Sequence, residues 1–279
     1  MMQKNQVCAG VTYMQSSFTQ YWEGTLERKN DNIGKLTTMA AMPMVNYGLT
    51  KKLNIIAGIS YVSTKASMGT LHRMKGFQDA SLDVKWKPYS LKKGKNTIAF
   101  FTVVGITTPL SNYVIDFLPM SIGLGSTNLT GRAIVDYQHD VFFATASASY
   151  SIRGNVKLDR NSYYTTTIHN TNEVEMPDMA TYNFSTGIRV NNLIAEIMVT
   201  KINTLGGFDI RKNDMPFVSN RMNSTMLGIN AKYILPFNEH IELVGGASTV
   251  LNGRNVGKST GFDTGVFYIF STKNKKSKA

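Results

Sequence analysis

The chain has 279 residues, of which 42% are hydrophobic and 17% are charged, fewer charges than the roughly 25% usual in soluble domains. No run approaches the roughly 18 consecutive apolar residues that a membrane-spanning helix needs, so a helical membrane protein is excluded. The net charge is +12, but the basic residues gather in short turns and at the C-terminus without interleaved aromatics, which argues against a nucleic-acid partner.

Alternation of apolar and polar residues, interrupted by turn residues, predicts about twelve strands along the chain. Each is roughly 9–12 residues long, the length that crosses a bilayer at the tilt of a barrel strand. A count of fourteen stays open, and 163–168 could extend a hairpin above the membrane. In chain order, we expect the strands at 5–15, 35–47, 53–63, 79–87, 96–107, 127–138, 141–153, 181–190, 193–200, 225–235, 241–250 and 262–271.

The strand at 141–153 shows the alternation clearly. Phe142, Ala144 and Ala146 share one face, and Phe143, Thr145 and Ser147 share the other. A soluble β-sandwich would show the same pattern with its apolar face inward. Alternation therefore predicts strands without choosing the solvent that they face.

Loop lengths make that choice, because the connections alternate long and short along the whole chain. Outer-membrane barrels combine short periplasmic turns with longer extracellular loops, and only an up-and-down meander sorts its connections this way. The long ones are 16–34, 64–78, 108–126, 154–180, 201–224 and 252–261; the short ones are 48–52, 88–95, 139–140, 191–192 and 236–240. We therefore expect an all-β, transmembrane, up-and-down antiparallel barrel with both termini periplasmic.

This interpretation assigns residues 1–271 to a barrel in a bacterial outer membrane and 272–279 to a basic C-terminal tail. Residues 1–10 lack the basic region and apolar run of a secretory signal, so we expect a form from which the signal peptide has been removed. Six of the seven prolines fall in or beside predicted connections. Pro43 alone lies inside a predicted strand, where it requires a bulge or a missing ladder bond.

If the apolar faces meet lipid, the opposite faces line the interior of the barrel. Both signs of charge occur there, so we expect interior ion pairs, because buried charges need partners. A barrel of this size has a narrow lumen that long side chains could largely fill. The predicted lumen-facing residues are Asp83, Lys85, Lys87, Arg132, Asp136, Arg153, Arg189, Glu196, Lys232, Glu242 and Asp263.

Two long loops carry apolar side chains that need an explanation. Phe18, Tyr21 and Trp22 are either an aromatic girdle at the membrane interface, the interpretation that we favour, or an aromatic entrance for an apolar solute. The loop at 108–126 is unusually apolar for an exposed segment. Its Phe117, Leu118 and Met120 would be covered if the loop folded inward as a plug or ligand cradle, or if it packed on a neighbouring loop.

No motif in the chain indicates catalysis. Residues 252–260 (NGRNVGKST) resemble a phosphate-binding loop but have the wrong glycine spacing and precede a strand, so we interpret them as a solvated loop. His72 and His169 fall in long loops, and His139 and His240 in short turns, without metal-ligand spacing. We expect no cofactor, no metal and no enzymatic activity, with a loop-borne hydrolase as the less favoured alternative.

Several short segments resemble one group of outer-membrane barrels. Residues 47–54 (YGLTKKLN) and 76–87 (GFQDASLDVKWK) are similar to its conserved turn and strand motifs, and 106–109 (ITTP) and 123–126 (GLGS) to the elements that follow. The group comprises the phenol-degradation (MetA-pathway) transporters, related to the fatty-acid and aromatic hydrocarbon channels. The similarity covers roughly 47–153 and implies passage of small hydrophobic compounds across the outer membrane.

The fatty-acid channels carry an N-terminal hatch, whereas here the first predicted strand starts a few residues from Met1, so any plug must come from a loop. We therefore expect a barrel whose partners are outer-membrane lipid and a small hydrophobic or amphipathic solute taken up passively. The alternative is a structural or partner-binding barrel whose lumen is closed by its own charged side chains.

Overall fold

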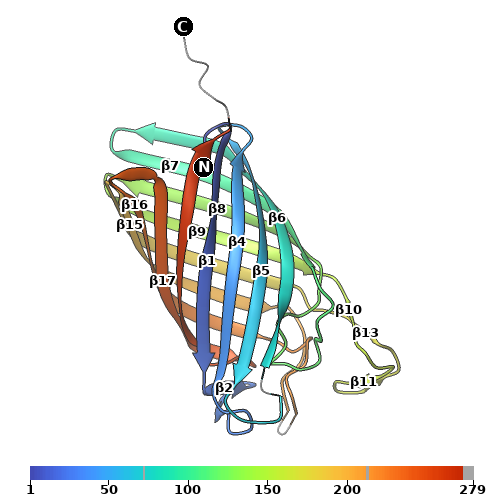
Figure 1. The fold of residues 1–279 in the computed structure, drawn as a ribbon. Helices are drawn as coiled ribbons and strands as arrows, with labels where there is room; N and C mark the ends of the chain where they lie inside the picture. The colour runs from blue at the N-terminus through green and yellow to red at the C-terminus, as the bar shows by residue number, and fades with distance from the viewer. Residues whose placement is uncertain (72, 212–213, 273–279) are drawn as a thin grey trace.

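In the computed structural model, which describes residues 1–71, 73–211 and 214–272, twelve antiparallel strands close into one barrel (Figure 1). The predicted tail at 272–279 lies outside the described residues except for Thr272. The barrel strands are β1 (Gln6–Phe18), β4 (Leu36–Gly48), β5 (Leu53–Ala66), β6 (Arg73–Lys93), β7 (Asn96–Pro109), β8 (Asn128–His139), β9 (Phe142–Arg153), β14 (Met179–Val190), β15 (Leu193–Thr204), β16 (Asn223–Leu235), β17 (Asn238–Arg254) and β18 (Thr260–Ser271).

The first and last strands complete the cylinder. β1 pairs with β18 from Gln6↔Ser271 to Ser17↔Thr260 and pairs with β4 along its other edge. Closure leaves no open sheet edge, so the backbone groups of every barrel strand find partners without water. None of the described residues forms a helix long and apolar enough to span a bilayer.

The predicted sorting of connections is confirmed. The tight turns, the start of β1 and the end of β18 lie at one end of the barrel, which we call the turn end and assign to the periplasm (Figure 1). Gly94, Asp140 and Asn191 have positive φ angles of 60°, 54° and 47°, as two-residue hairpins require. The opposite, loop end carries the short hairpins β2 (Gln20–Glu23) with β3 (Leu26–Lys29), β10 (Val156–Lys157) with β13 (Glu173–Val174), and β11 (Tyr163–Tyr164) with β12 (Ile168–His169).

β6 is the main error of the sequence-based strand prediction. It runs from Arg73 to Lys93, whereas the prediction covered only 79–87. Pro88 does not lie in a connection, because it sits inside the strand at a register shift between Trp86 and Tyr89. The bulge accommodates a residue that cannot donate a ladder hydrogen bond. Pro43 behaves as predicted: it has no partner in the β4–β5 register, although the register is unchanged on either side.

The outer surface of the barrel is apolar. Val104, Ile197 and Ile229 are 51%, 47% and 59% exposed although they lie in the middle of their strands. Aromatic pairs flank this belt, with Tyr61–Phe77 toward the loop end and Tyr89–Phe100 toward the turn end. An exposed apolar band between two aromatic girdles is the surface that a transmembrane barrel presents to lipid.

Candidate functional site

The loop between β7 and β8, residues 110–127, folds back against the inner wall of the barrel at the loop end; we call it the mouth segment. Met120 packs with Leu36 of β4 and Ala66 of β5. Ile122 packs with Ala40 and Val62, which lie four residues further into the barrel along the same two strands. Both apolar contacts lie on the strand faces opposite the exposed belt, so they remove apolar surface from water inside the barrel end.

Hydrogen bonds fix the mouth segment in this position. The Thr64 hydroxyl donates to the carbonyl of Met120 at 2.5 Å. The Tyr113 hydroxyl donates to an Asp79 carboxylate oxygen at 2.9 Å and accepts from the Gly125 amide at 3.0 Å. Burial, together with the Asp79 carboxylate, raises the pKa of Tyr113 well above its usual value, so this hydroxyl keeps its proton and both bonds persist at any physiological pH.

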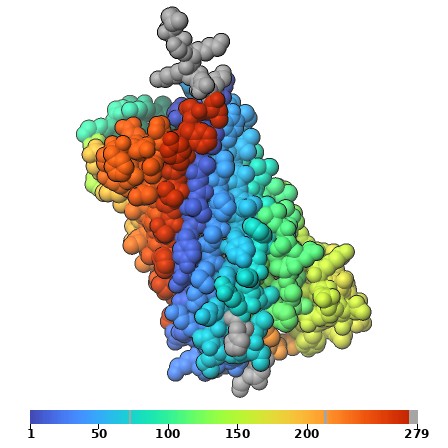
Figure 2. Space-filling model, in the orientation of Figure 1, coloured from blue at the N-terminus to red at the C-terminus, as the bar shows by residue number. Residues whose placement is uncertain are grey.

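The outer side of the mouth segment supports a second apolar cluster. Ile115 and Leu118 pack against Val156, Val174 and Val218 from the two longest loops. Asp116 also forms an ion pair with Arg160, with 3.2 Å between the charged atoms. The segment from β10 to β13 projects from this cluster beside the barrel, as the yellow-green region of Figure 2 shows. The mouth segment therefore joins the loop layer to the barrel wall.

The aromatic residues that follow β1 do not form a membrane girdle. Trp22 is 6% exposed and lies against Gly253, where a larger residue would clash with its ring. Phe18 packs with the Met120 cluster and covers Gly257. The favoured girdle interpretation is therefore wrong, because these rings turn into the loop layer and not toward lipid.

A pocket of about 110 Å³ lies where four of the loops meet, and we call it the mouth pocket. Three residues predicted at the entrance line it: Phe18, Tyr21 and Leu118. Of the other three predicted there, Trp22 and Met120 are buried beside it and Phe117 is 44% exposed. The remaining lining residues are Asn30, Asn32, Ile33, Pro119, Ile210, Asp214, Met215, Pro216, Asn255 and Val256.

Asn255 is the polar centre of the loops around this pocket. It is 4% exposed and has a positive φ of 54°. Its side-chain oxygen accepts from the amides of Gly24 at 2.7 Å and Ile210 at 3.0 Å. Its nitrogen donates to Asp209 and to the carbonyl of Arg221, both at 2.8 Å. One amide thus links three loops, so the interpretation of 252–260 as merely a solvated loop is wrong here.

Asp209 extends this network through a two-bond ion pair with Arg254. The guanidinium donates to its two carboxylate oxygens at 2.7 and 2.6 Å. The hydrogen bonds from Arg254, followed by that from Asn255, lower the pKa of Asp209 to about 2, against the opposing effect of desolvation. The carboxylate is therefore ionised across the physiological range. Sequence reasoning missed both residues, because no local pattern brings 209 near 255.

Asn255→Ala should loosen the loop layer without unfolding the barrel. It leaves the buried amides of Gly24 and Ile210 without their acceptor, at a cost of about 1–3 kcal/mol each. We expect faster amide hydrogen exchange at 205–211 and 254–259, with unchanged exchange in β8 and β9. Asn252→Ala, three residues earlier and exposed near the end of β17, is the matched control, and equal exchange in the two variants would contradict the role of Asn255.

Two ion pairs form among the predicted lumen-facing residues, both toward the turn end. Arg189 of β14 reaches across β9 to Asp136 of β8, at 2.7 Å between the charged atoms, and Thr145 donates to the same carboxylate at 2.6 Å. Lys232 of β16 and Glu242 of β17 are 2.6 Å apart. All of these side chains lie on faces opposite the exposed apolar belt.

The other predicted lumen-facing residues are not brought into ion pairs in the part of the chain that the structure describes. Asp83 lies over Gly105, where any larger residue would clash with its carboxylate. The Lys85 ammonium is 4.9 Å from the centre of the Phe101 ring. Lys87, Glu196 and Asp263 are half-buried and Arg132 is exposed. Glu196 also accepts a long hydrogen bond from Asn230. Arg153 lies at the loop end, where it donates to the carbonyl of Pro177.

The described histidines do not assemble a hydrolytic site. His169 Nε2 lies 2.9 Å from the Thr165 hydroxyl and its ring stacks on Tyr163, while His139 contacts Asn96 at the turn end. His72 lies outside the described residues. Among residues 1–71, 73–211 and 214–272, no group of three His, Cys, Asp or Glu side chains could hold a metal ion.

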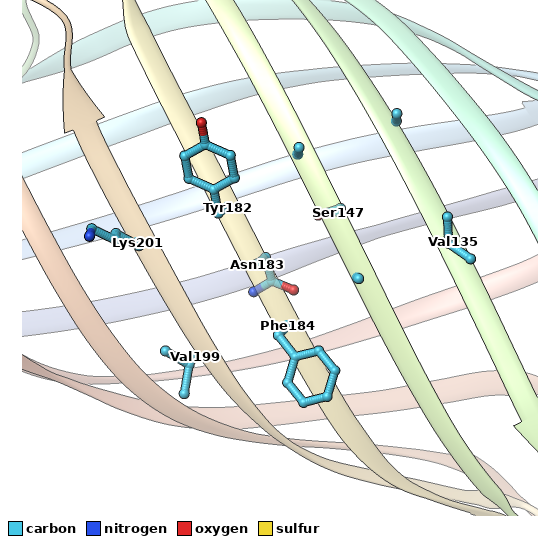
Figure 3. A pocket seen from close by; sticks show the side chains of 10 residues that line it. Val135, Ser147, Tyr182, Asn183, Phe184, Val199 and Lys201 are labelled. Carbon is cyan, nitrogen blue, oxygen red and sulfur yellow. The ribbon is translucent and has the colours of Figure 1, made fainter.

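A second hollow, of about 520 Å³, lies on the outer wall across β8, β9, β14 and β15 (Figure 3). Small side chains at Ala133, Ala146 and Ala148 form its floor, and Tyr182 and Phe184 flank it. It belongs to the apolar belt, so lipid chains occupy it and it is not a candidate for binding a solute from water.

Comparison with known proteins bears on the fold. No protein-family profile matches the chain, and neither does any curated protein. Among solved structures, an outer membrane channel from Pseudomonas putida F1 is similar with a TM-score of 0.77 and 14% identity over 97% of each chain. The translocator domain of the autotransporter NalP from Neisseria meningitidis gives 0.50 and 10% identity, over 96% of this chain and 90% of that one. The chain therefore has the fold of the outer-membrane β-barrels.

Proposed function

We propose that the protein is an outer-membrane channel for passive uptake of small hydrophobic or amphipathic molecules, which bind first in the mouth pocket. The observation that carries this proposal is the chemistry of the pocket lining. Apolar side chains such as Ile33, Leu118 and Met215 predominate. The polar groups of the lining are the Tyr21 hydroxyl, the amides of Asn30, Asn32 and Asn255, and the Asp214 carboxylate. A mostly apolar cavity with a small number of polar groups is typical of sites for small organic ligands.

The size of the pocket limits the solute. A cavity of about 150 Å³ accommodates benzene in another protein, so the 110 Å³ of the mouth pocket suits a molecule of about one ring or a short chain. Tyr21 and Asn32 could orient a hydroxyl or carbonyl group. The sequence resemblance to the phenol-degradation transporters, related to the aromatic hydrocarbon channels, supports the same class of solute, and the similar structure from Pseudomonas putida F1 is an outer membrane channel.

The mouth segment would act as the gate between this pocket and the lumen. Leu118 lines the pocket, while Met120 and Ile122, two and four residues further on, pack against the inner wall. A solute that competes for Leu118 would loosen the same segment that blocks its way. The predicted plug would thus come from a loop that packs against the inner wall.

A structural or partner-binding barrel with an occluded lumen is the second candidate. The Asp136–Arg189 and Lys232–Glu242 ion pairs favour it, because they place long side chains in the turn-end half of a narrow barrel. The two candidates differ in whether any solute passes.

Met215→Asp tests the uptake proposal. Met215 lines the mouth pocket and is 62% exposed, so the substitution adds a second carboxylate beside Asp214 at little cost to folding. We expect uptake of phenol or toluene into proteoliposomes, at concentrations below saturation, to fall about tenfold, which corresponds to about 1.4 kcal/mol of binding.

Met68→Asp is the matched control, because Met68 is also an exposed loop methionine, at 54%, and does not line the mouth pocket. Its uptake should equal that of the wild type. Equal losses in both variants, or wild-type protein that passes none of the solutes, would overturn the proposal in favour of the occluded barrel.

A further inference from the structure

Four basic side chains gather on the outer surface of the barrel at the loop end; we call them the basic rim. Lys65 of β5 pairs directly with Arg73 of β6, and Lys75 follows two residues along the same face. Lys35, just before β4, lies opposite Ser67 through a 3.0 Å backbone hydrogen bond and a 2.8 Å bond to the serine hydroxyl. All four are exposed.

The fold does not require this arrangement. Like charges directly opposite each other in a strand pair are destabilising, as Lys65 and Arg73 are. In the described part of the chain, none of the four cations lies within 4.0 Å of a carboxylate, although other loop cations such as Arg254 and Lys258 do. Arg73 Nε donates to the Ser63 hydroxyl at 3.1 Å, which does not neutralise its charge. A concentration of positive charge without carboxylate partners is typical of a site for an external anion.

The basic rim stands just above the lipid-facing belt. The outward Tyr61 and Phe77 pack edge to face at 5.3 Å and mark the aromatic girdle on the same two strands. Lys65 and Arg73 are each four residues beyond these rings, which places them about 10 Å further out along a tilted strand. The loop-end parts of β5 and β6 belong to the cyan region of Figure 2, which faces the viewer.

A hollow continues the rim toward the loops. It has a volume of about 560 Å³ and is lined by Lys35, Lys29 and Asn30, with the hydroxyl-bearing Thr19 and Ser67 beside them. Asp31 also lines it. Such a mixture of cations, amides and hydroxyls can hydrogen-bond a phosphorylated sugar as well as neutralise its charge.

We propose that the basic rim binds the phosphate groups of a phosphorylated glycolipid in the outer leaflet, with its sugars in the hollow and its acyl chains along Tyr61 and Phe77. Cations above an apolar surface match the order of groups in such a lipid, phosphate above hydrocarbon. The site rests on the membrane position of the barrel and is independent of solute uptake. It would also relieve the repulsion between Lys65 and Arg73.

The test is lipid binding by the purified full chain, measured by native mass spectrometry on release from detergent. The probes are diphosphoryl lipid A, monophosphoryl lipid A and phosphatidylethanolamine. The rim variant carries Lys35→Gln, Lys65→Gln, Arg73→Gln and Lys75→Gln; the control carries Lys51→Gln and Lys52→Gln in the exposed turn at the opposite end of β4 and β5.

We expect the wild type and the control to bind diphosphoryl lipid A at least about tenfold more tightly than the rim variant does. The monophosphoryl form should be intermediate, and the preference should weaken at high salt. Equal binding by all three proteins would overturn the site, as would competition by inorganic phosphate as strong as that of the lipid. Solute uptake by the rim variant should be normal, so a failure here is separate from a failure of the channel proposal.

Discussion

Replacing residues 112–125 with a four-residue Gly-Ser linker should increase solute flux through the barrel by at least about tenfold. The deletion removes Met120 and Ile122 from the inner wall and Leu118 from the mouth pocket, while β7 and β8 keep their register from Asn96↔His139 to Thr107↔Asn128. The barrel end then lacks the loop that packs against its inner wall. Liposome swelling with a small sugar, together with planar-bilayer conductance, measures the change.

A second loop deletion separates this effect from a general loosening of the loops. Removal of residues 165–167 shortens the turn between β11 and β12, which projects away from the barrel wall (Figure 1). That variant should show wild-type flux. If excision of the mouth segment also leaves flux unchanged, the side chains of the barrel interior close the lumen, and the occluded barrel is the better account.

Ile197→Arg should destabilise the folded barrel by about 2–4 kcal/mol, the cost of a cation facing lipid near the bilayer midplane. Ile197 lies in the middle of β15 and points outward, 47% exposed. Leu193→Arg on the same face of the same strand lies at the turn end, so it should cost only about 0–1 kcal/mol. Guanidinium unfolding in phospholipid vesicles measures both.

Both variants introduce the same side chain on the same face of β15. The expected difference in unfolding free energy therefore comes only from the depth of the arginine in the bilayer. A barrel that met water outside would tolerate arginine equally at 193 and 197, both of them exposed. Equal stability of the two variants would therefore contradict a lipid-facing outer surface.

The strands could be predicted from the sequence because period-two alternation and turn residues are local signals. The hairpin turns at Asp140 and Asn191 fall within one residue of their expected places. β6 could not be predicted in full, because a proline usually marks the end of a strand. Pro88 instead occupies a bulge, which only the pairing of β6 with β7 reveals. Strand existence was therefore predictable and strand extent was not.

For the candidate site, the sequence predicted the types of residues involved but not the contacts between them. The apolar character of 108–126 indicated a covered loop, and inward folding was one of the expected arrangements. Its contacts with Leu36 and Val62 depend on strands far away in the sequence. Likewise, charges of both signs indicated interior ion pairs, but Asp136 pairs with Arg189 across an intervening strand, which requires the register of three strands to be known. No sequence pattern pointed to Asn255, because its role depends only on hydrogen bonds to residues that are distant in the sequence.

In this barrel the exposed apolar faces of the strands touch hydrocarbon, while the alternate faces are enclosed. Adjacent residues in the middle of β9 test it most directly: Ala148 lies on the exposed face and Ser149 on the opposite one. Nitroxide labels at Ala148→Cys and Ser149→Cys, in a Cys8→Ser background and in lipid vesicles, report collisions with oxygen, which concentrates in hydrocarbon. We expect high oxygen accessibility at 148 and low accessibility at 149; equal or reversed values would contradict the account.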